Sequence, residues 1–118
     1  MAKSGVMPIH HTKTSDGSWD ADQVERRLDD DDVDAFRRTF AYVDEEKPDR
    51  KTGAKFPHHE VDADGNVGPA NVKACISAIG ILNGGRGGAD IDRSDRPEIY
   101  EHLAAHLRDA GREPPELE

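Results

Sequence analysis

The sequence predicts a mainly α-helical protein: one small domain of about four helices, with a short β-hairpin and extended N- and C-terminal tails. Apolar residues recur at three- and four-residue spacing, capping residues precede these segments, and glycines follow them. The chain has 118 residues, of which 34% are hydrophobic and 35% charged, so it fits one domain with a small core. We expect an extended arm over residues 1–17, a helical domain over 18–112 and an acidic tail over 113–118.

The first predicted helix begins at Ala21. Asp20 is placed to cap it, Gln23 completes a capping box, and the helix should end near Leu28. The aspartates that follow interrupt the helical pattern, and Asp31 or Asp32 can cap a second helix. The apolar face of that second helix should carry four side chains, those of Val33, Phe36, Phe40 and Val43.

A charged loop is expected over residues 44–55, and Asp64-Gly65 then supplies a turn between Val61 and Val67. This segment is predicted to form either a small hairpin or a structured loop. Gly68-Pro69 should open the third helix, with proline in its first turn. Its apolar face comprises Val72, Cys75, Ile76, Ile79 and Leu82, and Gly84 is placed to close it in the left-handed conformation.

The fourth helix should begin at Ser94 or Asp95, with Pro97 in the first turn, where its missing N–H costs little. Gly111 should stop it. The face toward the core is predicted to hold Ile99, Leu103, Leu107 and Ala110.

The charge is strongly acidic, with 25 Asp and Glu against 16 Lys and Arg and a net charge of −9. Such a chain repels polyphosphates, so free nucleic acid is not expected as a partner. An Asp-rich surface is typical of proteins that work in high salt, although acidic proteins of ordinary cells share it. No apolar run approaches the roughly 20 residues of a membrane span, and residues 1–15 lack a signal-peptide core. We therefore expect the protein to be made and kept in the cytoplasm, or in something assembled there, and we expect no membrane contact.

The sequence contains no motif for nucleophilic catalysis or phosphate binding, so we expect no enzyme. The lone Cys75 and Ser77 lie in the apolar helix, and no nucleophile elbow is present. The glycine-rich stretch around Arg86 lacks the lysine of a phosphate-binding loop, which leaves an architectural role for its glycines.

Two groups of side chains could hold a metal ion, although we expect no metal and no cofactor. The first has the spacing of a calcium loop but has Asp95 where glycine is needed: Asp90, Asp92, Ser94 and Glu101. The second consists of histidines: His58 and His59 are adjacent, and His102 and His106 are one helical turn apart. Either His58-His59 or His10-His11 could add a third ligand to the helical pair.

Four segments carry a resemblance to a known family. They are HHTKTSDGSWD at 10–20, KFPHHEV at 55–61, GPANVKACISAIGILNGGRGG at 68–88 and IYEHLAAHLRDAGREPPEL at 99–117. In this order they resemble an uncharacterised domain of tailed-phage and prophage proteins, which occurs among head-assembly genes, attached to prohead proteases or beside them. The resemblance covers residues 9–117. The chain departs from it at Gly85, where alanine is expected, and at Asp92, where proline is expected.

The resemblance implies a non-enzymatic structural protein of a virion head: a minor capsid, cement or decoration protein of a tailed bacteriophage or archaeal virus. Its partners would be the major capsid protein or other head proteins, and self-association stays open. The capsid-binding residues would be Val6, Met7, Ile9, His10, His11 and Arg86. Two alternatives remain: a small histidine-based metal-binding protein or enzyme, and a transient assembly factor that acts with the prohead protease.

Overall fold

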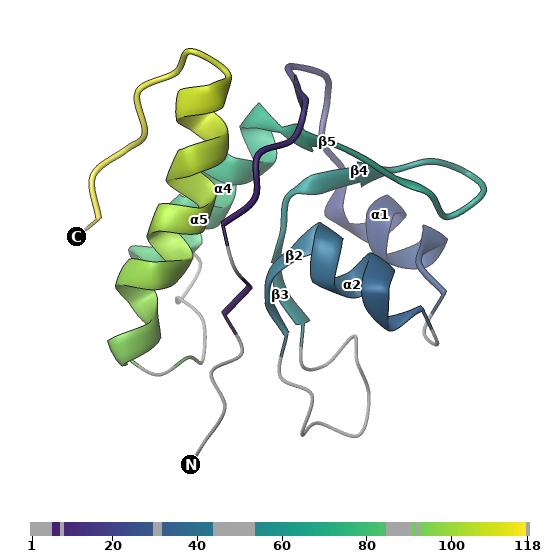
Figure 1. The fold of residues 1–118 in the computed structure, drawn as a ribbon, viewed down its shortest axis with the longest axis horizontal. Helices are drawn as coiled ribbons and strands as arrows, with labels where there is room; N and C mark the ends of the chain where they lie inside the picture. The colour runs from purple at the N-terminus through teal and green to yellow at the C-terminus, as the bar shows by residue number, and fades with distance from the viewer. Residues whose placement is uncertain are drawn as a thin grey trace.

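The computed structural model describes residues 6–7, 9–29, 32–43, 54–84, 91 and 93–117. In this part of the chain the helices are α1 (Ala21–Arg27), α2 (Val33–Thr39), α4 (Val72–Leu82) and α5 (Arg96–Asp109), the last preceded by a 3-10 turn, η2 (Arg93–Asp95). The strands are β1 (Thr14–Ser15), β2 (Phe40–Val43), β3 (Ala54–Pro57), β4 (His59–Val61) and β5 (Val67–Asn71). Figure 1 shows α4 and α5 on one side of the molecule and α1 and α2 on the other, with the strands between them.

The predicted fold class is wrong, because the protein is mixed α/β rather than mainly α. The described strands form two sheets. One has the order β1-β5-β4, with β1 parallel and β4 antiparallel to β5, and the other is the antiparallel pair β2-β3. Each strand has five residues or fewer, too short for periodicity to separate it from a helix or a loop.

The starts of the first two helices are confirmed, because each is set by a local aspartate. Asp20 accepts a hydrogen bond from the backbone N–H of Gln23, and Asp32 accepts one from Ala35. The predicted end of the second helix is wrong, because α2 ends at Thr39 rather than continuing through Val43. The chain becomes strand β2 at Phe40, so Phe40 and Val43 are buried from a strand. The side chain of Val33 lies outside the described part.

The third helix begins later than predicted. Residues 68–71 belong to strand β5, and Asn71 caps α4 by accepting a hydrogen bond from Ala74 N–H. The Gly68-Pro69 opening is therefore wrong. Ile76 is also misplaced, since it is 44% exposed rather than part of the apolar face. The closure at Gly84 is confirmed, because its φ is +99°.

Two further predictions are confirmed. The segment around Asp64-Gly65 is a hairpin between β4 and β5, and Gly65 has a φ of +85°. The last helix follows Asp95, has Pro97 in its first turn and ends before Gly111, whose φ is +74°. None of the described helices is both long and apolar enough to cross a membrane.

The hydrophobic residues form two clusters rather than one. The α4–α5 core contains Ala41, Phe56, Val72, Cys75, Ala78, Ile79, Leu82, Ile99, Leu103 and Leu107. The α1–α2 core contains Val24, Leu28, Ala35, Phe36, Phe40, Val43, Ala54 and Val61. Because adjacent strand residues face opposite ways, Phe40 serves one core and Ala41 the other, and the β2-β3 pair lies between them.

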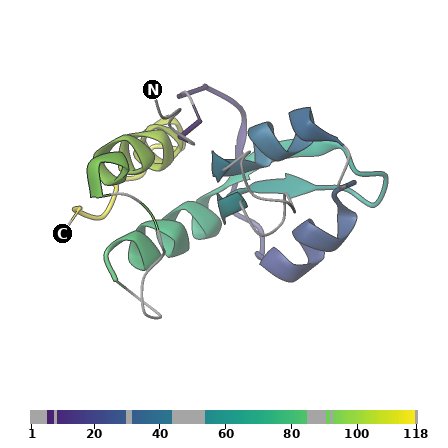
Figure 2. The ribbon, with the colours of Figure 1, turned by 90° about the horizontal axis from the view of Figure 1, so that it is seen from below.

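The described residues of the N-terminal arm pass between α5 and strand β2 (Figures 1 and 2). Val6 bridges to Tyr42, Met7 N–H donates to the Ala41 carbonyl at 2.9 Å, and Thr14 pairs with Ala70. The arm is thus joined to both sheets. At the other end of the chain, Tyr100 Oη donates to the carbonyl of Pro115, which holds the C-terminal segment against α5.

Candidate metal centre

Five of the six histidines converge on one buried position between the two cores. In four of them, one nitrogen of each ring lies within 4.8 Å of one nitrogen of every other ring: His10, His58, His59 and His106. The fifth, His102, has its Nε2 3.1 Å from Nε2 of His58. His58, His59, His102 and His106 are each at most 1% exposed.

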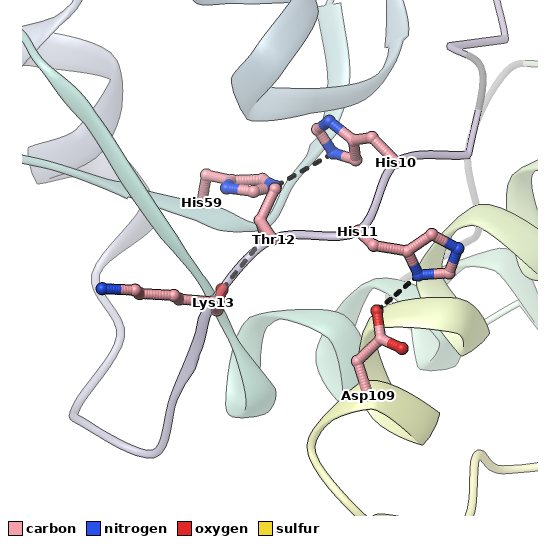
Figure 3. A network of polar contacts seen from close by, with 6 residues as sticks. All are labelled: His10, His11, Thr12, Lys13, His59 and Asp109. Atoms are coloured by element: carbon pink, nitrogen blue, oxygen red, sulfur yellow. Dashed lines mark hydrogen bonds and ion pairs between the residues drawn. The ribbon is translucent and has the colours of Figure 1, made fainter.

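Three separate segments bring these rings together. His10 comes from the arm, which Figure 3 shows with His10 directed toward His59. His58 lies in the break between β3 and β4, where its N–H donates to the carbonyl of Thr39 at the end of α2 and its carbonyl accepts from Asn71 at the end of β5. His102 and His106 lie one turn apart on α5, on the same face.

The orientation of three rings is fixed by hydrogen bonds to backbone carbonyls. Nδ1 of His58 lies 2.9 Å from the Phe56 carbonyl oxygen, and Nδ1 of His59 lies 2.8 Å from that of Gly68. Nδ1 of His102 lies 3.1 Å from the Met7 carbonyl oxygen. A carbonyl only accepts, so Nδ1 must carry the proton in each ring. Nε2 is then left with a free lone pair, as in histidines that ligate metals.

These lone pairs point at one another. His58 and His102 both have unprotonated Nε2 atoms, 3.1 Å apart, and no hydrogen bond can form between two acceptors. The facing lone pairs of His58 and His102 would be stabilised by a cation among the nitrogens, or by a proton that one of the two rings would have to bind. Nε2 of His59 lies 3.2 Å from Nε2 of His10, which can donate to it in the tautomer that carries the proton on Nε2.

His106 lies in the same cluster, and neither of its ring nitrogens has a hydrogen-bond partner. A neutral imidazole has one donor and one acceptor, and leaving such groups buried without partners costs about 1–3 kcal/mol. The other rings of the cluster surround it, with centroids 4.9 Å away for His10 and 5.0 Å away for both His58 and His59. A metal ion would satisfy the acceptor nitrogen of His106.

Burial keeps the rings neutral. Desolvation, and then repulsion from the neighbouring histidines, lowers the pKa of His58 well below the ordinary 6.5. Desolvation likewise lowers the pKa of His59 to about 4 and that of His106 to about 3. The pKa of His10 is lowered for the same reason. Neutral imidazole is the form that binds a metal, so the rings need not lose a proton at neutral pH.

The backbone next to the cluster is strained at one residue. Phe56 is buried and has a φ of +63°, a conformation that residues other than glycine rarely adopt. Its carbonyl oxygen accepts the Nδ1 proton of His58. Strain of this kind persists where the surrounding structure fixes a functional geometry, and here it orients a ring of the cluster.

The remaining predicted site residues are placed elsewhere. His11 points away from the cluster and its Nδ1 lies 2.8 Å from Asp109 Oδ2 (Figure 3). Glu101 is exposed, and its Oε2 lies 3.3 Å from Nη1 of Arg108. Ser94 is also exposed. Three predicted residues lie outside the described part: Arg86, Asp90 and Asp92.

The arm residues predicted to bind a capsid are described in part. Val6 and Met7 are half-buried against the domain, whereas Ile9 is 50% exposed. These side chains line a surface hollow of about 360 Å³ with Pro97 and Glu101.

Sequence reasoning identified four members of the cluster but placed His10 in a tether. The sequence predicts that His58-His59 or His10-His11 adds a ligand. In the structure both His58 and His59 belong to the cluster, whereas of the other pair only His10 does. The 49 residues that separate His10 from His59 carry no signal for their contact. Only the pairing of the arm with β5 creates it.

No protein-family model, curated protein or solved structure matches this chain.

Proposed function

We propose that this protein binds one divalent transition-metal ion, such as zinc, through His10, His58, His59 and His106. The observation that carries the proposal is the convergence of these four rings, whose nitrogens lie within 4.8 Å of one another in a buried cluster. Without an ion, His106 stays unpartnered and lone pairs face each other. With one, the acceptor nitrogen of His106 gains a partner and the lone pair of His58 binds the ion.

The donor set favours a transition metal. Every nitrogen donor of the cluster is an imidazole, a ligand that suits zinc, copper, nickel and iron, whereas calcium and magnesium require oxygen. Tetrahedral zinc with bonds of about 2.0–2.1 Å places its ligand nitrogens about 3.3 Å apart. The contact between His59 and His10 is 3.2 Å, close to that spacing. The wider-spaced nitrogens, up to 4.8 Å apart, would have to move inward to bind the same ion.

The bound ion would act as a clamp. It would join the arm, the start of β4 and helix α5, three segments that are far apart in the sequence. The chain is small and charged, and its hydrophobic residues are split between two cores, so such a link would stabilise it substantially.

The experiment uses the full chain expressed without an affinity tag. Metal content is measured after purification, and zinc is titrated into the metal-free protein by calorimetry. We expect one zinc per chain and a rise in melting temperature. Replacing His59 with alanine should weaken zinc binding by at least tenfold.

The matched control is His11→Ala, because His11 adjoins His10 on the arm but lies outside the cluster. This variant should bind zinc as the unchanged protein does. Well under one zinc per chain, or an equal loss in the His11 and His59 variants, would contradict the proposal.

We keep the role in a virion head as a second proposal, because one observation favours it. Ile9 is one of two large hydrophobic side chains exposed in the described part, and it borders the hollow of about 360 Å³ along the arm. A head protein could bind there while the metal holds the arm in place. Mass spectrometry of purified virions tests for the protein, and rebinding to stripped virions should fail without residues 1–15. Equal rebinding without the arm would exclude the tether.

A further inference from the structure

A cavity of about 350 Å³ adjoins the histidine cluster. His10 and His59 form part of its wall, and Val67 and Pro69 contribute apolar surface. Neither His58, His102 nor His106 lines it. A metal ion in the cluster would therefore be approached from this cavity past His10. The volume suits a ligand of a few heavy atoms.

Two cationic side chains also line the cavity, those of Lys13 and Arg38. Arg38 lies close enough to His59 to contribute to the lowering of its pKa. Its ion pair with Asp34 at 3.4 Å is exposed on both sides, so solvent screens it and leaves the guanidinium able to bind another anion. In a chain with a net charge of −9, two cationic residues in the wall of this cavity make a local site for negative charge.

His10 is the ligand most easily exchanged. His58 and His59 are held by Nδ1 bonds to carbonyls, and His106 is buried on a helix. His10 is only half-buried and belongs to the arm, and the one hydrogen-bond contact found for its ring within the described residues is that with His59. A metal ligand without a hydrogen bond that orients it is held less firmly.

We propose that a small oxyanion, a carboxylate or a phosphate, enters this cavity and takes the coordination position of His10. The bond between the metal and the imidazole nitrogen breaks, a bond to an anion oxygen forms, and His10 leaves as the neutral ring. Lys13 and Arg38 bind the remaining anion oxygens. This inference rests on the proposed metal site. It makes that four-histidine site one that can bind an outside ligand.

The test uses the full chain loaded with cobalt in place of zinc, with free cobalt removed, because the visible spectrum of cobalt reports its ligands. Inorganic phosphate and acetate are titrated separately. We expect a saturable spectral change with each, and tighter binding of phosphate because it has the larger charge. Changing Lys13 and Arg38 together to glutamine should weaken phosphate binding at least tenfold while leaving cobalt affinity unchanged.

The matched control changes Arg26 and Lys73 to glutamine, two exposed cations that do not line the cavity, and phosphate affinity should stay the same. In His10→Ala the coordination position is already open, so phosphate should bind at least tenfold more tightly. A cobalt-loaded protein whose spectrum does not respond to either anion would overturn the anion site and leave the metal site standing. A chain that fails to bind cobalt would overturn both. Equal loss of phosphate affinity in the two double variants would also overturn the anion site.

Discussion

Replacing His106 with leucine should stabilise the metal-free protein and at the same time abolish most of its response to zinc. In the metal-free chain both ring nitrogens of His106 are buried without partners. Leucine has a similar volume and no polar atom, so the change removes a penalty of about 1–3 kcal/mol. For a domain of this size that corresponds to a rise in melting temperature of roughly 4–12 °C.

With zinc the sign reverses. At free zinc one hundred times the dissociation constant, the unchanged protein gains about 2.7 kcal/mol from binding, whereas the variant has lost one of four ligands and gains much less. The assay is thermal unfolding of both proteins, with chelator and with buffered zinc. His11→Ala serves as the control that keeps the zinc response.

Two results would refute this reasoning. If His106→Leu lowers the stability of the metal-free protein, then the ring has partners that the structure does not show. If zinc stabilises both proteins equally, then His106 is not a ligand.

Three further predictions concern pH and local geometry. In the folded protein the pKa of His59 is about 4 and that of His106 is about 3, whereas both are 6.5 in the unfolded chain. Between these folded and unfolded pKa values, the unfolded state binds more protons than the folded state. The metal-free protein should therefore lose stability as the pH falls from about 6.5 toward 3, and His59 alone should account for a loss on the order of 3 kcal/mol. Saturating zinc should shift this loss to lower pH. Urea unfolding measures the stability, and a free energy of unfolding that stays constant over this pH range would contradict the prediction. Gly65→Ala should lower the free energy of unfolding by about 1–2 kcal/mol, because the φ of Gly65 is +85° and the new methyl group would lie 3.2 Å from a backbone carbonyl oxygen. Gly80→Ala in α4 should raise it by up to about 1 kcal/mol, because the new methyl group meets nothing within 4 Å. Asn71→Ala should cost about 2–3 kcal/mol, measured by denaturant unfolding, because it removes the cap of α4 and a hydrogen bond to a neighbouring carboxylate; a loss below about 0.5 kcal/mol would show that the cap is dispensable.

Local chemistry accounts for the features that the sequence predicted correctly. Asp20 and Asp32 each cap the helix that follows by accepting a hydrogen bond from the backbone N–H three residues ahead, and Gly84 and Gly111 each follow the end of a helix with a positive φ. These features depend only on neighbouring backbone atoms, which is why they can be recognised from residues a few positions apart.

The fold class needed information that is not local. The spacing of Phe36, Phe40 and Val43 fits a helix, but Phe40 to Val43 is a strand because residues 54–57 pair with it. Residues 68–71 likewise follow the strand pairing with β1 and β4 rather than the proline signal for a helix start. A short apolar segment takes the form that its partner allows.

By itself the sequence determined the capping aspartates of α1 and α2, the glycines that follow α4 and α5, the hairpin turn, the acidic charge and the histidine pairs, because each depends on composition or on near neighbours. Only the tertiary structure decided that His10 joins His58, His59 and His106 while His11 turns to Asp109. The arm, the β3-β4 break and α5 meet through strand pairing and packing between segments that are far apart in the chain. The candidate site lies where they meet, so no stretch of sequence contains it.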